Sequence, residues 1–184
     1  MPSIFTHSFV GIISASIFKT TKFKIKFFIL SIICPVLPDL DVLAFKFGIP
    51  YEHFFGHRGF FHSLSFAFLL AAIIILIFFW SKEIKFKSKF GLLLYFFILT
   101  ASHGILDAFT SGGLGIALLS PFDNTRYFFP YTPIKVSPLG ISAFFGEWGK
   151  RVIISEMLWV WLPLIILFIL VKVILWIRYN RLTR

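Results

Sequence analysis

The sequence predicts an all-α integral membrane protein, a polytopic helical bundle of about four to five membrane segments with a long outer loop. Hydrophobic residues make up 58% of the 184 residues and charged residues only 14%, whereas roughly a quarter of a soluble domain is charged. The apolar residues fall into blocks separated by short basic runs. No polar stretch is long enough for a separate soluble domain, so residues 1–184 are expected to form a single membrane-embedded domain.

The first two apolar segments, 4–18 and 23–37, are short for a membrane span. Pro35 and Pro38 are expected to end the second one. These segments could be full but tilted helices, or half-spans packed against the bundle. A cleavable signal peptide is the alternative for the first segment, but its basic residues follow the apolar stretch instead of preceding it, which favours a retained segment.

Three longer segments follow, at 64–80, 90–109 and 157–177. The last is expected to be broken by Pro163 and carries Lys172, whose side chain could extend toward the nearby membrane surface. Between the second and third of these segments, the loop 110–155 is rich in Gly and Pro, which predicts turns and short segments.

The formal net charge of +10 could indicate a nucleic-acid-binding protein, but the basic residues lie between apolar blocks and form no basic face of a soluble domain. We therefore expect no nucleic-acid partner. Short basic runs are typical of cytoplasmic loops, and alternating the segments places the loops 38–61 and 110–155 outside. The predicted inner groups are Lys19, Lys22, Lys24 and Lys26; Lys82, Lys85, Lys87 and Lys89; and Arg178, Arg181 and Arg184.

Most of the few acidic residues and all of the histidines fall on the predicted outer side. An ionisable side chain in a bilayer is costly unless it is paired or bound to a metal. Four separate pieces of sequence bring such residues to this side. The candidate metal ligands are His7, Asp39, Asp41, His57, His62, His103 and Asp107.

Each piece also has a structural interpretation. His103 and Asp107 are four residues apart and share a helix face, where they could form a simple polar contact. Asp39 and Asp41 follow a proline and could be turn or cap residues. His7 alone could be structural.

Taken together, imidazole and carboxylate groups form the ligand set of catalytic zinc, manganese or iron sites. Seven ligands are more than one ion needs, and two ions bridged by a carboxylate would account for the number, so we expect one or two divalent ions, zinc before manganese or iron. Such a metal would activate water against a phosphoester. Arg58 and Ser63, in the same motif as two of the histidines, are the candidate catalytic residues. Arg58 could pair with a phosphate or orient a ligand carboxylate. Cys34 is the only cysteine, so no internal disulfide can form.

The order of these motifs resembles the YdjM-like family of inner-membrane proteins described as metal-dependent hydrolases. The resemblance covers roughly residues 1–140, and Phe61 stands where the family commonly has Thr. It implies a bacterial inner-membrane location and a metal-dependent hydrolase. The matching motifs are Thr6-His7, Pro38-Asp39-Leu40-Asp41, His57-Arg58-Gly59-Phe60-Phe61-His62-Ser63, Ser102-His103-Gly104-Ile105-Leu106-Asp107, Thr110-Ser111-Gly112-Gly113 and Ser120-Pro121-Phe122.

The resulting hypothesis is a multi-pass membrane hydrolase with its site on the non-cytoplasmic side. Its partners are the lipid bilayer and a lipid or phosphoester substrate, because the spacing of His103 and Asp107 is also similar to that in zinc-dependent phospholipase C. Two alternatives use the same residues: a metal-binding transporter, and a structural membrane protein with a polar His/Asp cluster. The sequence does not determine the oligomeric state.

Overall fold

The structure, a computed structural model, describes residues 1–18, 23–82 and 84–182. Within those ranges the regular elements are all helical, and β-pairing is limited to two isolated bridges. The predicted all-α class is therefore confirmed for the part of the chain described. Three of the basic residues considered above, Lys19, Lys22 and Arg184, lie outside the described residues.

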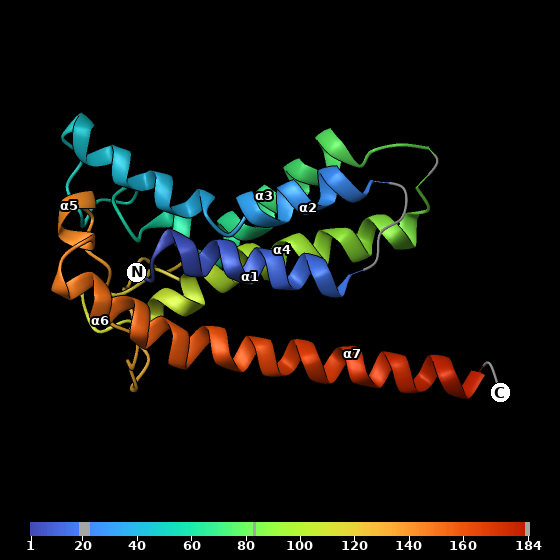
Figure 1. Ribbon diagram of the computed structural model, residues 1–184. Helices are drawn as coiled ribbons and strands as arrows, with labels where there is room; N and C mark the ends of the chain where they lie inside the picture. The colour runs from blue at the N-terminus through green and yellow to red at the C-terminus, as the bar shows by residue number, and fades with distance from the viewer. Residues whose placement is uncertain (19–22, 83, 183–184) are drawn as a thin grey trace.

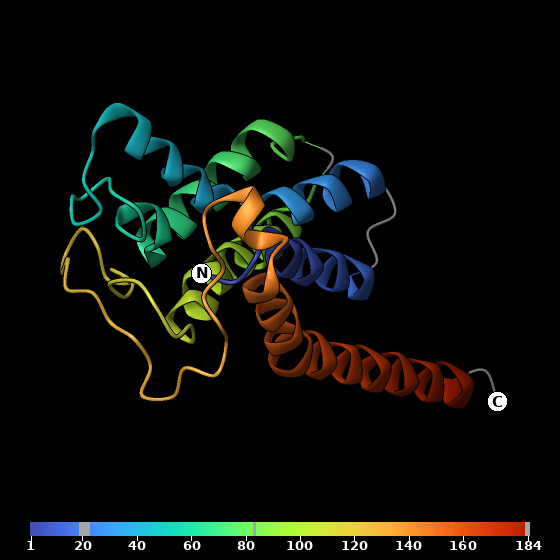
Figure 2. The same ribbon diagram turned by 60° about the vertical axis from the view of Figure 1, so that its left-hand side comes forward.

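The bundle consists of α1 (Ile4–Ile17), α2 (Lys24–Ile33), α3 (Leu64–Phe78) and α4 (Phe86–Ala108). Helix α1 packs against α2 and α4, and α3 packs against α4 (Figure 1). A long helix, α7 (Leu162–Leu182), contacts α1 and continues beyond the bundle (Figure 2).

Close packing between α1 and α2 depends on a glycine. A Cβ atom at Gly11 would lie 2.1 Å from the Ser31 carbonyl oxygen, so only glycine permits this helix separation. Aromatic side chains fill the core farther along the bundle, where Phe27, Phe79 and Phe96 are buried together with the thiol of Cys34.

Two helical stretches are long and apolar enough to cross a membrane: α4 and the continuous helix Glu147–Arg181. Helix α2 and the 3-10 helix η1 (Leu37–Phe47) meet the same criterion together, although they are bent by 46° where they meet. Helices α1 and α3 are shorter, and the 15 residues of α3 reach only about 22 Å, against the roughly 30 Å of a hydrocarbon core. The described residues thus contain two spans, or three with the bent pair, so the predicted count of four to five is not confirmed.

The predicted loop 110–155 contains more helix than its composition suggested. It includes α5 (Ile141–Phe144) and α6 (Glu147–Glu156), and α6 continues through the π-helical turn η3 (Met157–Trp161) into α7. The expected break at Pro163 is therefore wrong, because the wider turn just before it accommodates the proline ring without ending the helix. Lys172 also differs from expectation, since its Nζ donates a 2.9 Å hydrogen bond to the Ser16 carbonyl of α1.

Candidate metal centre

Four separate elements meet at the end of the bundle that holds the N-terminus (Figure 1). They are the first turns of α1, the start of η1, the segment leading into η2 (Phe60–His62), and the last two turns of α4. Helix α2 ends at Ile33, two residues before Pro35, so the chain turns there into η1 as the prolines predicted. All seven predicted ligands are buried at this end: His7, Asp39, Asp41, His57, His62, His103 and Asp107.

Four of these residues form a compact group. One ligand atom from each of Asp39, His62, His103 and Asp107 lies within 4.8 Å of all the others. The Nε2 atoms of His62 and His103 lie 3.6 and 3.3 Å from the Asp39 Oδ1. The same two atoms lie 3.5 and 4.0 Å from the Asp107 Oδ2. These distances leave the four atoms facing a common point, as ligands of one cation do.

A second group shares His62 with the first and adds Asp41 and His57. Here the contacts are tighter: His57 Nδ1 and Asp41 Oδ1 are hydrogen-bonded at 2.6 Å, and His62 Nδ1 lies 3.1 Å from Asp41 Oδ2. His62 therefore directs one ring nitrogen to each group. A carboxylate behind the far nitrogen of a metal-binding histidine orients the ring and makes it more basic.

The tautomer of His103 is fixed by the main chain. Its Nδ1 donates a 2.7 Å hydrogen bond to the Pro35 carbonyl, which can only accept. A neutral ring then has its lone pair on Nε2, the atom that faces Asp39 and Asp107.

His7 lies at the edge of the cluster and belongs to neither group. Its ring stacks on that of His103 with centroids 3.9 Å apart, and its Nε2 lies 3.5 Å from the Asp107 Oδ1. Neither ring nitrogen of His7 has a hydrogen-bond partner in the structure.

Arg58 is buried, and both of its Nη atoms are hydrogen-bonded to protein groups. Its Nη1 donates to the Gly112 carbonyl at 2.6 Å and its Nη2 to the Thr110 hydroxyl at 3.0 Å. Its Nε lies 3.4 Å from the Asp107 Oδ2, and its main-chain N–H donates to the Asp41 Oδ2 at 3.0 Å. Of the two predicted uses of this residue, the geometry matches the orienting of ligand carboxylates.

The glycine-rich stretch after α4 leaves space for the Arg58 guanidinium. Gly113 has a φ of 93°, and a Cβ atom there would lie 2.6 Å from Arg58 Nη1. Arg58 itself has a φ of 64°, an uncommon conformation for a residue with a side chain. The Thr110-Ser111-Gly112-Gly113 motif was the only signal in the sequence for these contacts.

Ser63 lies at the N-terminus of α3. Its hydroxyl accepts a 3.0 Å hydrogen bond from the Phe66 N–H, which is the usual N-cap arrangement. It belongs to neither ligand group.

The cluster carries excess negative charge and unsatisfied polar atoms. Of the three carboxylates of Asp39, Asp41 and Asp107, only that of Asp107 contacts the Arg58 guanidinium, while Asp41 accepts a hydrogen bond from the Arg58 main-chain N–H. Burial disfavours a protonated His62, yet contacts with Asp39 and Asp41 outweigh it and raise the pKa of His62 to about 9. Both oxygens of Asp39 and of Asp107, both nitrogens of His62 and the Nε2 of His103 lack hydrogen-bond partners. Buried groups of this kind normally have partners, so a cation fits the site.

One buried residue near the site was missed by the sequence reasoning. Glu156, at the end of α6, is fully buried, and its carboxylate accepts hydrogen bonds from the Ser3 N–H, the Ser3 hydroxyl at 2.6 Å and the Thr6 hydroxyl at 2.7 Å. The first turn of α1 contains no acidic residue, so Glu156 supplies the negative charge that a helix N-terminus favours. It thereby holds the turn that carries His7.

The apolar spans and the buried His/Asp group at one end of the bundle define the class of this protein. It is a helical membrane protein with a candidate metal centre. The chain belongs to the YdjM inner membrane protein family, whose profile matches residues 1–181. It is 39% identical over 166 residues to inner membrane protein YbcI of Escherichia coli (strain K12), a match that covers 89% of this chain and 92% of the relative. No solved structure matches it significantly. The predicted family is confirmed, and the protein is an inner membrane protein.

Proposed function

We propose that the protein is a metal-dependent hydrolase of the bacterial inner membrane, built from the whole chain as one domain, that cleaves a phosphoester in a lipid-linked substrate. One observation carries this proposal: Asp39, His62, His103 and Asp107 direct buried, partnerless ligand atoms to a common point. Protein interiors do not normally leave such atoms unsatisfied.

The ligand set suits a borderline-soft divalent ion. Two imidazole nitrogens and two carboxylate oxygens are typical of zinc, and manganese or iron accepts the same groups. The second group is better suited to orienting than to binding another ion, because Asp41 is already hydrogen-bonded to His57 and to the Arg58 main chain. We therefore propose one ion, with Asp41 and His57 behind its His62 ligand.

A divalent ion held there would act as a Lewis acid and lower the pKa of water toward neutrality, which supplies a nucleophile without a serine or cysteine. The chain's own residues prepare the site. Arg58 holds Asp107 in place through its Nε contact. His7 offers a partnerless imidazole beside Asp107, a group suited to accepting a proton during catalysis.

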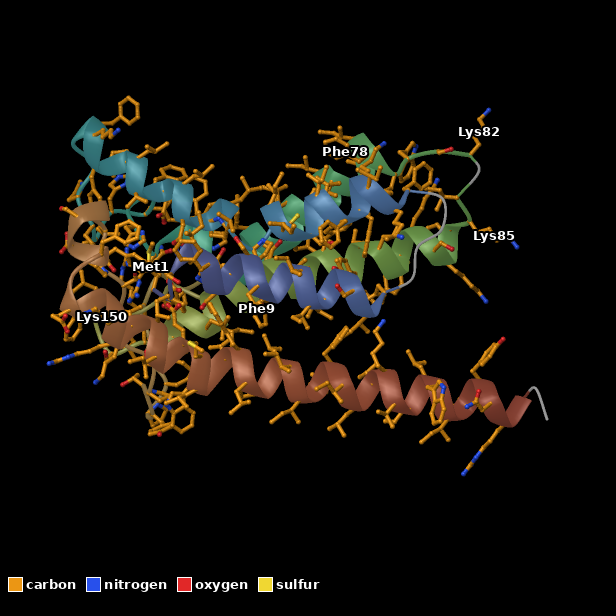
Figure 3. All side chains as sticks on the ribbon, in the orientation of Figure 1. Met1, Phe9, Phe78, Lys82, Lys85 and Lys150 are labelled. Atoms are coloured by element: carbon orange, nitrogen blue, oxygen red, sulfur yellow. The ribbon has the colours of Figure 1, made fainter. Side chains whose placement is uncertain are left out.

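For the membrane arrangement we propose five embedded segments: α1, the bent pair of α2 and η1, α3, α4 and α7. The basic ends then face the cytoplasm and the metal centre faces the other side. Figure 3 supports this polarity, since Lys82 and Lys85 lie at the end opposite Met1 and Lys150.

Hydrolysis by the purified full chain in lipid nanodiscs tests the proposal. A chromogenic phosphodiester and a phospholipid should both be cleaved, activity should disappear with a chelator, and added zinc should restore it. His103→Ala should lose at least about 100-fold in rate. The exposed Glu147, which contacts Lys150, provides the control, and Glu147→Gln should match the parent protein. A folded, metal-free protein that ignores chelators would refute the proposal.

A structural role for the cluster is the competing explanation, because Arg58 and Asp41 also tie separate elements together. In that case His103→Ala would lower the yield of folded protein, and the parent protein would bind no metal. A transporter is less well supported, since ionisable residues in transporters lie near the middle of broken helices. Here His103 and Asp107 occupy the last two turns of α4.

A further inference from the structure

An apolar groove of about 250 Å³ lies beside the metal centre. Its walls come from the start of α1, from η1, from the segment before α5 and from α5 itself. The side chains that line it include Phe5, Val42, Pro138, Leu139, Phe144 and Phe145.

The groove and the metal centre share two elements. Val42 directly follows Asp41 on η1. Ile4, which also lines the groove, lies three residues before His7 on α1 and therefore on the same helix face. The groove therefore begins within about one helical turn, roughly 5 Å along the axis, of Asp41 and of His7.

Met1 forms part of the groove wall and is held there by the main chain. It lines the groove, and the Ser137 N–H donates a 2.9 Å hydrogen bond to its carbonyl.

Away from the centre, a second hollow adjoins the groove. It shares Phe144 and Phe145 with the groove and continues along α6 past Lys150, Ile153 and Ile154. Trp148 lies on this helix, partly exposed, with its Nε1 bonded to the Val136 carbonyl at 2.9 Å. Tryptophans of this kind mark the boundary between headgroups and acyl chains.

We infer that the groove is a binding site for one acyl chain of a membrane phospholipid, which places the headgroup phosphoester at the metal centre. An acyl chain is the occupant we infer because the walls are apolar and the protein is an inner membrane protein. The groove, about 250 Å³, would hold part of the chain, since it is below the ~300–1,000 Å³ typical of sites for whole drug-sized ligands. The role of the bound lipid as substrate rests on the proposed function. The binding itself does not.

Gly140 offers a way to fill the groove without distorting the fold. It lines the groove, and the nearest atom to a Cβ placed there would be the Ala143 Cβ at 3.9 Å. Gly140→Leu should therefore fold and occupy the space intended for the chain. The matched control is Gly91→Leu on α4, because a Cβ atom at Gly91 would meet nothing within 4 Å.

The binding test uses the full chain in nanodiscs that contain phosphatidic acid with a diazirine in one acyl chain, with chelator present so that no cleavage occurs. Cross-links should concentrate on Phe5, Val42, Leu139 and Phe144, should drop several-fold in Gly140→Leu, and should be unchanged in Gly91→Leu. Labelling no denser there than on the exposed face of α3, or insensitive to Gly140→Leu, would overturn the inference.

The substrate role is measured separately. Gly140→Leu should lower the ratio of long-chain to short-chain phospholipid cleavage about tenfold relative to Gly91→Leu, and an unchanged ratio would overturn this role. If labelling follows the expected pattern but the protein binds no metal, the proposed function fails and the acyl-chain site stands. If metal binds but labelling does not follow the pattern, only the inference fails.

Discussion

The Nδ1 of His103 donates a 2.7 Å hydrogen bond to the main-chain carbonyl of Pro35. This contact joins α4 to the turn after α2 and directs the His103 Nε2 toward Asp39, 3.3 Å away. The proline that ends α2 thus also orients a candidate metal ligand. An outer-shell partner of this kind typically contributes about 10–100-fold to metal affinity.

Asp107 should be the most sensitive ligand position, since its oxygens face His7, His62, His103 and Arg58. Asp107→Asn keeps the shape of the side chain but removes its charge. Zinc should raise the melting temperature of the parent protein, because a ligand that binds only the folded state stabilises it, and this rise should vanish in Asp107→Asn. Glu147→Gln should retain the full rise. A rise of equal size in Asp107→Asn would show that zinc binds elsewhere.

Gly104 should be required for the approach of α4 to η2. A Cβ atom there would lie 2.4 Å from the His62 carbonyl oxygen, so Gly104→Ala should push His62 away from His103 and reduce both stability and zinc affinity. Gly91→Ala, on the same helix with open space around it, should be neutral or stabilising by up to about 1 kcal/mol. Isothermal titration with zinc and thermal unfolding of both variants provide the comparison. Equal behaviour of the two would contradict the close approach of His62 to α4.

Glu156 should stabilise α1 from a distance of some 150 residues along the chain. Glu156→Ala leaves the Ser3 and Thr6 donors without their acceptor, which should cost about 2–4 kcal/mol of unfolding free energy. Denaturant unfolding in a mild detergent measures the loss. Because His7 follows Thr6 directly, proteolysis near residue 7 should also become faster. A change below about 0.5 kcal/mol, the usual effect of a surface substitution, would contradict this role.

Arg58→Lys tests the guanidinium while keeping the charge. Lysine cannot reproduce the two hydrogen bonds to Gly112 and Thr110, so unfolding free energy should fall by about 2–3 kcal/mol. Arg151, which is exposed on α6, supplies the control Arg151→Lys, expected to change little. If Arg58 instead bound only substrate phosphate, Arg58→Lys would leave stability intact and weaken substrate binding.

The membrane orientation can be measured by cysteine labelling. The native Cys34 is buried, so a membrane-impermeant maleimide should report only on an introduced cysteine. In intact cells, Lys150→Cys should react from outside the inner membrane and Lys85→Cys only after the membrane is opened. The reverse pattern would place the metal centre on the cytoplasmic side.

The sequence identified the polar residues that are buried together at one end of the bundle, whereas the predicted number of membrane spans is not confirmed. Because charged residues are scarce in this chain, the His and Asp residues beside its apolar segments were the candidate ligands. All seven of them are buried at one end of the bundle. The partition of six of them into two groups, with His7 in neither, could not be predicted, because it depends on how η1 and α4 approach each other. The burial of Arg58 against Gly112 was likewise invisible, since it requires a loop folded back onto a residue 54 positions earlier.

The errors in the fold also have physical causes. Most of helix α6 (Glu147–Glu156) fell within the loop predicted from Gly and Pro content, but the helix forms and packs one of its charged residues, Glu156, inward. Glu156 is buried because hydroxyls of the distant α1 satisfy it, which no local pattern reveals. Pro163 did not break the helix because the π-helical turn η3 precedes it.

Anomalous diffraction at the zinc absorption edge, from crystals of the full chain grown with zinc, tests the central claim most directly. The proposal predicts one strong peak enclosed by Asp39, His62, His103 and Asp107, with ligand distances of about 2.0–2.2 Å. It would be contradicted by a site without a peak in which His62 and His103 hydrogen-bond directly to the two carboxylates.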